Sequence, residues 1–347
     1  MSDKTPVTVA AFTGGKEVPS ARFRLRQYSG KLSEAGVDVR EYWTSQGAYP
    51  PSAHWRRPFW LAASLTQRLP HLLAARAADV TLLQREMIST LVTLEGLTPR
   101  PRILDVDDAI HLFRDGRTAQ ALARRVDLVI VGNPWLAEAW RRWTPHVEVL
   151  PTAVDLSLFD PLPALGELPS SPPVPSPAVI GWIGTSGNLR YLEAIAPALR
   201  EVVRRFPKLV LSVCCDRPPQ LDGIRVRFVP WSPDAERSFF RDLSVGLMPM
   251  EDSLWEKGKC SFKMLQYLAA GRPCVVSPYG MNAEVLAQSV GALAACSQED
   301  WTEALCTLLA DPTAAAQRGA AGRELIAKHY DLGVLAPRLA ELIRSVL

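Results

Sequence analysis

The stretch WEKGKCSFKMLQYLAAGRPCVVSPYGMNAE, from Trp255 to Glu284, is the most informative part of this chain. It predicts a loop with two lysines, then a helix, a short buried strand over Cys274–Val276, and a turn that opens another helix. The Gly-Arg-Pro run ends the first helix. Lys259 and Lys263 stand four residues apart at the start of that helix. Backbone N–H groups at a helix start, with ammonium groups beside them, favour a bound phosphate group.

Composition places the chain among globular proteins. Of its 347 residues, 48% are hydrophobic and 22% are charged, and no apolar run approaches the roughly 20 residues that span a bilayer. The first residues lack the basic and apolar regions of a signal peptide, so we expect a cytoplasmic protein. All six cysteines lie in the second half without CxxC spacing. We expect them to be buried thiols in a reducing compartment.

The charge distribution argues against a nucleic-acid partner. The net charge is +3, and residues 1–160 contain 20 Lys and Arg against 17 Asp and Glu. This excess is too small for a nucleic-acid-binding protein, and no basic stripe with stacking aromatic residues is present. We therefore expect no nucleic acid among the partners.

A proline-rich stretch divides the chain. Residues 160–177 contain seven prolines, which exclude a regular helix or strand. On both sides of it, strands alternate with helices, a pattern that predicts doubly wound parallel sheets. The predicted strands are Val7–Phe12, Val37–Tyr42, Val80–Gln84, Arg102–Val106, Leu128–Val131, Val147–Leu150, Val179–Ile183, Leu209–Cys214, Val226–Val229 and Val245–Met248. The main predicted helices are Phe23–Ala35 and Leu189–Phe206, with further ones over 299–310 and 312–329.

The order of features from Trp255 to Glu284 resembles the donor-binding segment of GT-B glycosyltransferases, especially glycosyltransferase family 4, also called group 1. The resemblance implies an α/β fold of two Rossmann-like domains that face each other across a cleft. It implies an acceptor-binding domain over 1–160, a linker over 161–177 and a nucleotide-sugar-binding domain over 178–330. A C-terminal helix over 331–347 could pack back on the first domain.

The same resemblance implies the reaction. A hexosyltransferase-type enzyme would move a sugar from a nucleotide-diphosphate sugar to a hydroxyl group of a saccharide or lipid-linked saccharide, with retention of configuration, as in polysaccharide biosynthesis. Protein charge would stabilise the departing diphosphate, so we expect no cofactor and no metal ion. Two alternatives stay open: a nucleotide-sugar epimerase on the same fold, and a degenerate subunit that acts as a binding partner.

The loop Gly-Thr-Ser-Gly-Asn after the strand Val179–Ile183 resembles the family's diphosphate loop, and Asn188 is expected to cap the following helix. An ordinary strand-to-helix turn explains it equally well. Trp231 is expected to stack on the donor base, although burial in the core is an equal alternative. The predicted donor-binding residues are Gly184, Thr185, Asn188, Trp231, Lys259, Lys263 and Gln266.

One family feature is missing. The family carries two glutamates separated by seven residues, and the corresponding positions here are Gly258 and Gln266. Gln266 could still bind a ribose hydroxyl. Glu256 is close in sequence but out of register. This departure keeps the degenerate-subunit alternative open.

Three aspartates, Asp105, Asp107 and Asp108, stand at the end of the predicted strand Arg102–Val106. Asp107 or Asp108 is the predicted catalytic base or acceptor clamp, and His111 is the next candidate. A helix N-cap is the structural alternative for the two aspartates. Asp105 and Asp107 also match the metal-binding DxD pattern of GT-A glycosyltransferases, which the two-domain alternation argues against.

Two further segments are candidates for acceptor contacts. In the first loop, Gly14, Gly15, Arg22 and Arg24 are predicted to contact the acceptor or a phosphate group. Between His54 and Ala77, aromatic residues stand beside arginines, which suits peripheral contact with the inner face of a membrane. A helix packed on its own domain is the favoured alternative for that segment.

Overall fold

Two compact units make up the structure, a computed structural model that describes residues 6–16, 18–47, 49–160, 177–288 and 290–347. The first unit comprises the described residues up to Ala153, together with Lys257–Cys260 and Leu332–Leu347. The second comprises the described residues of Val154–Glu256 and Ser261–Asp331. The predicted linker over 161–177 lies outside the described residues, apart from Pro177.

The first unit is built on a six-stranded sheet with the order β2-β1-β3-β4-β5-β6, and every pair in it is parallel. Its central strands β3 and β4 are buried along their whole length, because helices cover both faces of a doubly wound sheet. The strands are β1 Val7–Phe12, β2 Val37–Tyr42, β3 Val80–Gln84, β4 Arg102–Val106, β5 Leu128–Val131 and β6 Val147–Val149.

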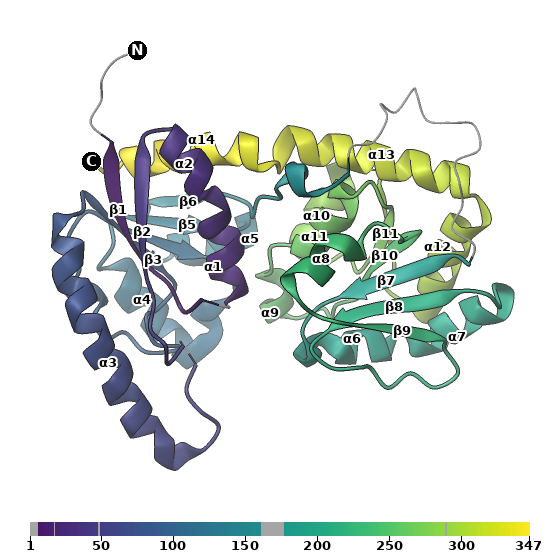
Figure 1. The fold of residues 1–347 in the computed structure, drawn as a ribbon, viewed down its shortest axis with the longest axis horizontal. Helices are drawn as coiled ribbons and strands as arrows, with labels where there is room; N and C mark the ends of the chain where they lie inside the picture. Colours follow the sequence, from purple (N-terminus) through teal and green to yellow (C-terminus); the bar gives the residue numbers. More distant parts are fainter. Residues whose placement is uncertain (1–5, 17, 48, 161–176, 289) are drawn as a thin grey trace. The chain divides into compact units, whose positions relative to one another are not determined.

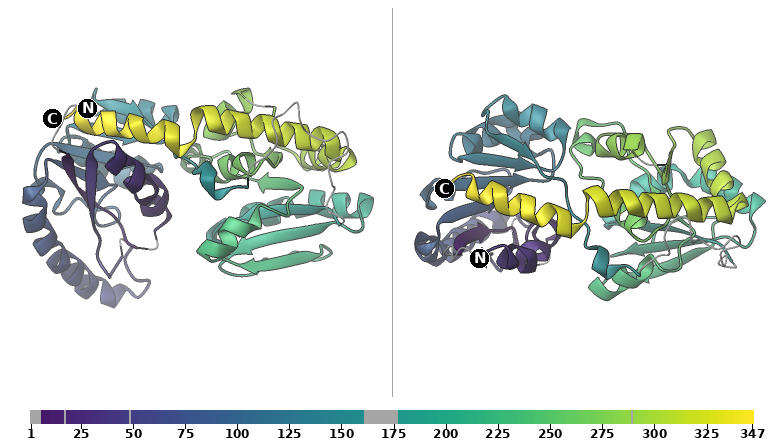
Figure 2. Two further views of the ribbon diagram at one scale, coloured as in Figure 1. Left: turned by 45° about the horizontal axis from the view of Figure 1, so that its top comes forward. Right: turned by 90° about the horizontal axis from the view of Figure 1, so that it is seen from above.

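The helices of the first unit include the C-terminal one. Leu335, Leu339 and Ile343 of α14 lie in the same hydrophobic core as residues of β1, β3 and α2. Figures 1 and 2 show α14, in yellow, lying beside α2 in each view. The helices are α1 Pro19–Arg24, α2 Ser29–Glu34, α3 Arg57–Ala74, α4 Arg117–Ala123, α5 Pro134–Arg141 and α14 Leu332–Arg344, with short 3-10 helices η1 Arg26–Tyr28, η2 His54–Arg56, η3 Ala75–Ala77, η4 Glu95–Leu97 and η5 Ile110–Gly116.

The second unit has its own parallel six-stranded sheet, with the order β12-β11-β10-β7-β8-β9. Its strands are β7 Val179–Ile183, β8 Val210–Cys215, β9 Val226–Pro230, β10 Val245–Met248, β11 Cys274–Val276 and β12 Ala292–Ala294. Its helices are α6 Leu189–Ala194, α7 Ala196–Arg205, α8 Pro233–Phe239, α9 Leu254–Lys257, α10 Phe262–Ala269, α11 Met281–Gln288, α12 Gln298–Ala310 and α13 Pro312–His329, with 3-10 helices η6 Leu156–Leu158 and η8 Ser186–Asn188. The predicted α/β class with two doubly wound parallel sheets is confirmed.

Two long predicted helices are broken. The segment predicted as one helix over Phe23–Ala35 forms α1, η1 and α2, because Leu25 leaves the helical region with φ −130° and ψ −64°. The helix predicted over Leu189–Phe206 divides into α6 and α7 at Ile195. Pro197 in the first turn of α7 lacks the N–H group that a continuous helix would need there.

The parallel strands direct their carboxyl ends to one edge of each sheet, where such folds place their ligands. In the first unit, Gln84 at the end of β3 is in register with Asp105 on β4. In the second unit, the segments after β7 and β10 lead into the predicted donor-binding residues. Functional sites are therefore expected at these two edges, each within its own unit.

Candidate functional site

The loop after β7 brings two predicted donor-binding residues together. Lys263, in the first turn of α10, has its Nζ 5.1 Å from the ring centre of Trp182. A methyl group at Gly184 would lie 2.7 Å from Cη2 of Trp182 and 3.1 Å from Cε of Lys263. Gly184 is therefore required for the close approach of the lysine to the loop. The ammonium group lies near the carboxyl end of the central strand β7, where an anion fits.

The rest of this loop differs from the prediction. Asn188 does not cap α6, since its side chain makes no capping bond and its Nδ2 donates to Oγ1 of Thr185 at 3.2 Å. Ser186 donates both its backbone N–H and its hydroxyl group to Asp216, each at 2.6 Å. These hydrogen bonds lower the pKa of Asp216, the side-chain one contributing most. The loop is thus held in place by a charged side chain of the same unit.

A buried carboxylate connects two other predicted donor-binding residues. Glu236 in α8 is only 8% exposed. Its Oε2 accepts a hydrogen bond from Nε1 of Trp231 at 3.2 Å, and its Oε1 accepts one from Nε2 of Gln266 at 3.0 Å. Both residues are consequently fixed in orientation by one carboxylate at the same end of the sheet.

The predicted lysine pair is separated. α10 begins at Phe262, after Ser261 turns the chain with φ +51°, so the prediction that both lysines stand at the start of one helix is wrong. Lys259 belongs to the segment Lys257–Cys260, which the structure assigns to the first unit. There its carbonyl oxygen accepts a hydrogen bond from Nδ2 of Asn133 at 3.1 Å. Lys263 is the member of the pair that lies in the second unit.

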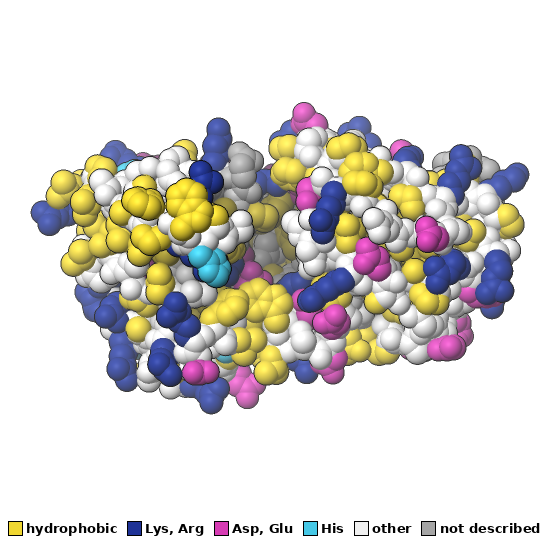
Figure 3. Space-filling view, turned by 90° about the horizontal axis from the view of Figure 1, so that it is seen from below, with side chains coloured by type: hydrophobic (Ala, Val, Ile, Leu, Met, Phe, Trp, Pro, Cys, Tyr) yellow, Lys and Arg dark blue, Asp and Glu magenta, His cyan; other side chains and the backbone are white. Residues whose placement is uncertain are grey.

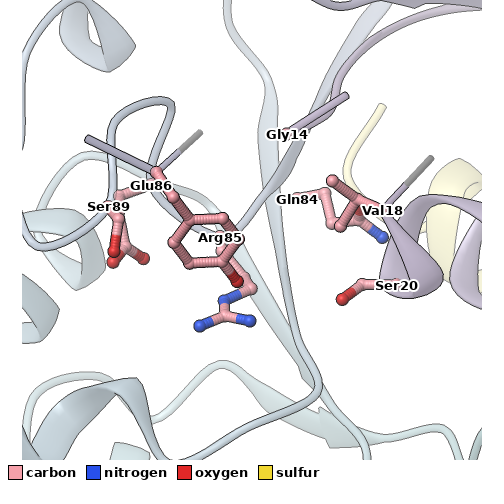
Figure 4. A pocket seen from close by; sticks show the side chains of 8 residues that line it. Gly14, Val18, Ser20, Gln84, Arg85, Glu86 and Ser89 are labelled. Atoms are coloured by element: carbon pink, nitrogen blue, oxygen red, sulfur yellow. The ribbon is translucent and has the colours of Figure 1, made fainter. Parts of the chain in front are cut away.

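The first unit contains an open pocket at the carboxyl end of β3. Gly14 from the first loop lies in its wall, whereas the pocket lining does not include Gly15, Arg22 or Arg24. Figure 4 shows Glu86 and Ser89 on one side of the pocket, and Val18 and Ser20 on the other. The lining residues are Gly14, Val18, Ser20, Tyr49, Gln84, Arg85, Glu86 and Ser89.

Arg24 is a correction to the predicted site. It is 5% exposed, and its Nε lies 3.1 Å and 3.2 Å from the two carboxylate oxygens of Asp105. Its Nη1 donates to the carbonyl oxygen of Leu150 at 2.6 Å. Burial works against the charge of Arg24, but Asp105 raises its pKa above the ordinary value. We therefore remove Arg24 from the acceptor contacts, and Asp105 is not available as half of a DxD metal site.

Arg22 and Gly15 of the first loop stay predicted acceptor or phosphate contacts, although neither lines the pocket. Arg22 is partly exposed, with its guanidinium 4.7 Å from the ring centre of the adjacent Phe23. Gly15 adopts φ +154°, and its carbonyl oxygen accepts from Nη2 of Arg26 at 2.8 Å. Gly15 thus allows the backbone conformation of the loop.

Asp107 and Asp108 flank Arg85. Nη1 of Arg85 lies 3.0 Å from Oδ2 of Asp108 and 3.9 Å from Oδ1 of Asp107. Burial would lower the pKa of Arg85, but the two aspartates raise it above the ordinary value. Neither aspartate caps η5, whose N-cap residue is Ala109 and makes no side-chain bond. The N-cap alternative is therefore wrong, and both aspartates stay predicted catalytic residues.

His111, the next catalytic candidate after the two aspartates, packs against an aromatic side chain. It is 8% exposed, and its ring centre lies 5.2 Å from that of Trp135. Burial, and then the charge of Arg142, lower the pKa of His111. The side chain is accordingly neutral at pH 7.

Comparisons with known proteins find a family model that matches part of the chain. Residues 177–311 match the family model Glycosyl transferases group 1. No curated protein matches the chain. The matched residues lie in the second unit, apart from Lys257–Cys260.

Solved structures extend the likeness to the whole chain. It is similar to sucrose-phosphate synthase from Thermosynechococcus elongatus, with a TM-score of 0.69, 16% identity and 98% of each chain covered. It is similar to HepE from Anabaena, solved with UDP-glucose, with a TM-score of 0.70, 12% identity, and 97% of this chain and 99% of that chain covered. WaaG, a glycosyltransferase involved in lipopolysaccharide biosynthesis, has a TM-score of 0.66 and 14% identity over 96% of this chain and 99% of its own. The predicted GT-B glycosyltransferase fold is confirmed.

The missing glutamate of the family pattern has a steric explanation. A methyl group at Gly258 would lie 2.7 Å from Cβ and 2.8 Å from the backbone nitrogen of Ala109. No side chain fits there. Glu256 does not replace it, because its Oε1 accepts from the hydroxyl group of Tyr191 at 2.6 Å and the residue is 1% exposed.

Sequence reasoning missed the residues that line these sites from strand ends. Gln84 is the last residue of the buried strand β3, and Arg85 and Glu86 directly follow it in the sequence. A polar run at the end of a buried strand is the signal that could have found them. Glu236 stands five residues after Trp231, but only its contacts with Trp231 and Gln266 give it a role.

Among the described residues, no group of three or more His, Cys, Asp or Glu side chains could hold a metal ion. The described helices include none that is long and apolar enough to cross a bilayer.

Proposed function

We propose that this chain transfers a sugar from a nucleotide-diphosphate sugar to a hydroxyl group of an acceptor. The observation that carries the proposal is the position of Lys263 beside Gly184 within a segment that matches the group 1 glycosyltransferase family model. An ammonium group at the start of α10 stabilises the charge that develops on a departing diphosphate. The Anabaena relative binds UDP-glucose, which makes uridine diphosphate sugars the first donors to test.

The second unit supplies the other donor contacts in this proposal. Thr185 and the loop around it follow β7 at the ligand edge of the sheet. Trp231 offers an aromatic face for the base, and Gln266 an amide for a ribose hydroxyl group. Glu236 fixes both side chains, so their orientation is set before the donor binds.

The first unit holds the acceptor in this proposal. Asp107 or Asp108 orients the acceptor hydroxyl group, and Arg85 restricts both carboxylates. We further propose retention of configuration, in keeping with the predicted family. An epimerase or a degenerate subunit would bind the same nucleotides, so turnover decides between the three.

The test combines binding with turnover. Purified protein is melted in the presence of UDP-sugars and other nucleotide sugars, and release of nucleoside diphosphate is measured with and without saccharide acceptors. A ligand at 100 times its Kd stabilises the folded state by about 2.7 kcal/mol, so a donor should raise the melting temperature. Binding without nucleotide release would support the epimerase if the sugar of the donor is isomerised and the degenerate subunit if it is not, and absence of any binding would contradict the proposal.

We also propose that α3 touches an anionic membrane. It packs on the first unit through Ser64, Arg68 and Leu72, while Trp55 and Phe59 are each 72% exposed. No Asp or Glu occurs over residues 42–78, so the exposed aromatic residues lie in a basic segment. Figure 3 views the side of the molecule on which α3 lies and shows hydrophobic and basic side chains together at that end.

Vesicle sedimentation tests this contact. Wild-type protein should sediment with vesicles that contain phosphatidylglycerol, and Trp55→Ser with Phe59→Ser should abolish this. Equal sedimentation of the wild type and the double variant would refute it.

A further inference from the structure

The strongest unexplained feature lies in the pocket of the first unit. Gln84 is 4% exposed, yet neither its Nε2 nor its Oε1 has a hydrogen-bond partner in the described residues. A buried amide without partners is costly, and native proteins rarely keep one without a reason. Because Gln84 lines the pocket, a ligand group that both donates and accepts would satisfy it.

Glu86, which lines the same pocket, carries a second buried polar atom without a hydrogen-bond partner among the described residues. It is 4% exposed, and its Oε1 accepts from the backbone N–H of Thr90 at 2.7 Å. Its Oε2 has no hydrogen-bond partner among the described residues. Thr90 itself has φ +64°, so the loop is held in an unusual conformation that keeps Glu86 in place.

The charges around the pocket favour an uncharged ligand. The guanidinium of Arg85 faces Asp107 and Asp108 and also interacts with Glu86, so three carboxylates surround one positive charge. A phosphate or carboxylate group would be repelled there, whereas a hydroxyl group can accept from Nε2 of Gln84 and donate either to Glu86 or to Oε1 of Gln84. These charges argue against the phosphate contact that was predicted for the first loop.

The shape of the pocket limits how much of a ligand enters. Tyr49 is 58% exposed, whereas Gln84 and Glu86 are each 4% exposed. The pocket has about 20 Å³ of room for a water-sized group, so one hydroxyl group of a sugar reaches Gln84 while the ring itself stays near Tyr49, whose aromatic face suits the apolar side of a sugar.

Resting on the proposed function, we propose that this pocket binds an uncharged sugar unit of the acceptor, with Gln84 and Glu86 as its binding residues. The acceptor is then an unphosphorylated saccharide at this position. Neither residue needs to take part in the chemical step.

Paired variants separate binding from folding. Gln84→Leu removes the unsatisfied amide and keeps an apolar volume, so we expect an unchanged or higher melting temperature and loss of sugar binding. Thr81→Val in the same strand is the control, because Oγ1 of Thr81 donates to the carbonyl oxygen of Pro99 at 3.0 Å. This control should lower the melting temperature and leave sugar binding intact. Glu86→Gln keeps an oxygen for the N–H of Thr90 and should weaken sugar binding about tenfold or more.

The probes are methyl α-glucoside, methyl α-mannoside and methyl α-galactoside, with glucose 6-phosphate and glucuronate as charged counterparts, all observed by saturation-transfer NMR. We expect signals from at least one neutral glycoside, lost in Gln84→Leu, and none from the charged sugars. Stronger binding of a charged sugar would overturn the proposal, as would no binding of any neutral one, which would indicate that ordered water alone fills the pocket. UDP-sugar binding is measured in the same samples, so failure of the pocket is distinguished from failure of the donor site.

Discussion

Gly184 offers a sharp test of how the donor loop is built. In Gly184→Ala the new methyl group would lie 2.7 Å and 2.9 Å from two ring carbons of Trp182. Trp182 is 1% exposed within the core of the second unit, so it cannot move aside. The backbone at position 184 must therefore shift, and the flexible side chain of Lys263, whose Cε would lie 3.1 Å from the methyl group, would be displaced with it. Overpacking of this kind costs about 1–3 kcal/mol.

The expected result follows from these contacts. A unit of this size loses about 2–4 °C in melting temperature per kcal/mol, so Gly184→Ala should melt about 2–12 °C below the wild type. It should also bind nucleoside diphosphate more weakly, because Lys263 shifts. Melting curves and isothermal titration calorimetry measure the two effects.

Gly187→Ala is the matched control in the same loop. A methyl group at Gly187 would meet nothing within 4 Å, so we expect the wild-type melting temperature and a modest change at most in affinity. If both variants melt and bind alike, the packing of Gly184 against Trp182 and Lys263 does not control the loop, and the reasoning is refuted.

Two further predictions concern the first unit. If Asp107 or Asp108 is the catalytic base, its substitution by Asn should lower kcat by about a hundred- to ten-thousand-fold and leave donor affinity unchanged. Wild-type turnover in both Asp107→Asn and Asp108→Asn would exclude a catalytic role for either residue. The pKa of His111 is lowered in the folded state, so the unfolded chain binds the proton more readily and stability should fall as pH drops below about 6.5. Melting curves from pH 7.5 to 5.5 should show a shallower decline in His111→Gln, and an identical decline would contradict this assignment.

The sequence was sufficient for the fold class and for the described strands other than β12, Ala292–Ala294, which was not predicted. Runs such as Val80–Gln84 and Val245–Met248 are short, apolar and bounded by turn residues, and they form buried strands in the structure. Helix breaks were harder to predict. Leu25 interrupts a helical pattern with no Gly or Pro beside it, so local propensity gave no warning.

Site residues depended on long-range packing. Arg24 was predicted to contact the acceptor or a phosphate group, but Asp105, 81 positions away, binds it in the interior. The absence of a side chain at Gly258 is explained by the closeness of Ala109, a contact that no local sequence pattern indicates. Lys263 and Gly184 were found by family pattern, and the structure brings them together, whereas the unpaired amide of Gln84 could be recognised only from its surroundings.

The most direct test of the central claim is nucleoside diphosphate binding by Lys263→Ala, with the exposed Lys208→Ala of the same unit as control. A charge-assisted hydrogen bond is worth roughly 1.5–3 kcal/mol, so calorimetry with UDP should show about a ten- to hundred-fold loss of affinity in Lys263→Ala and none in the control. Equal affinity in the two variants would contradict the assignment of the second unit as the donor-binding domain.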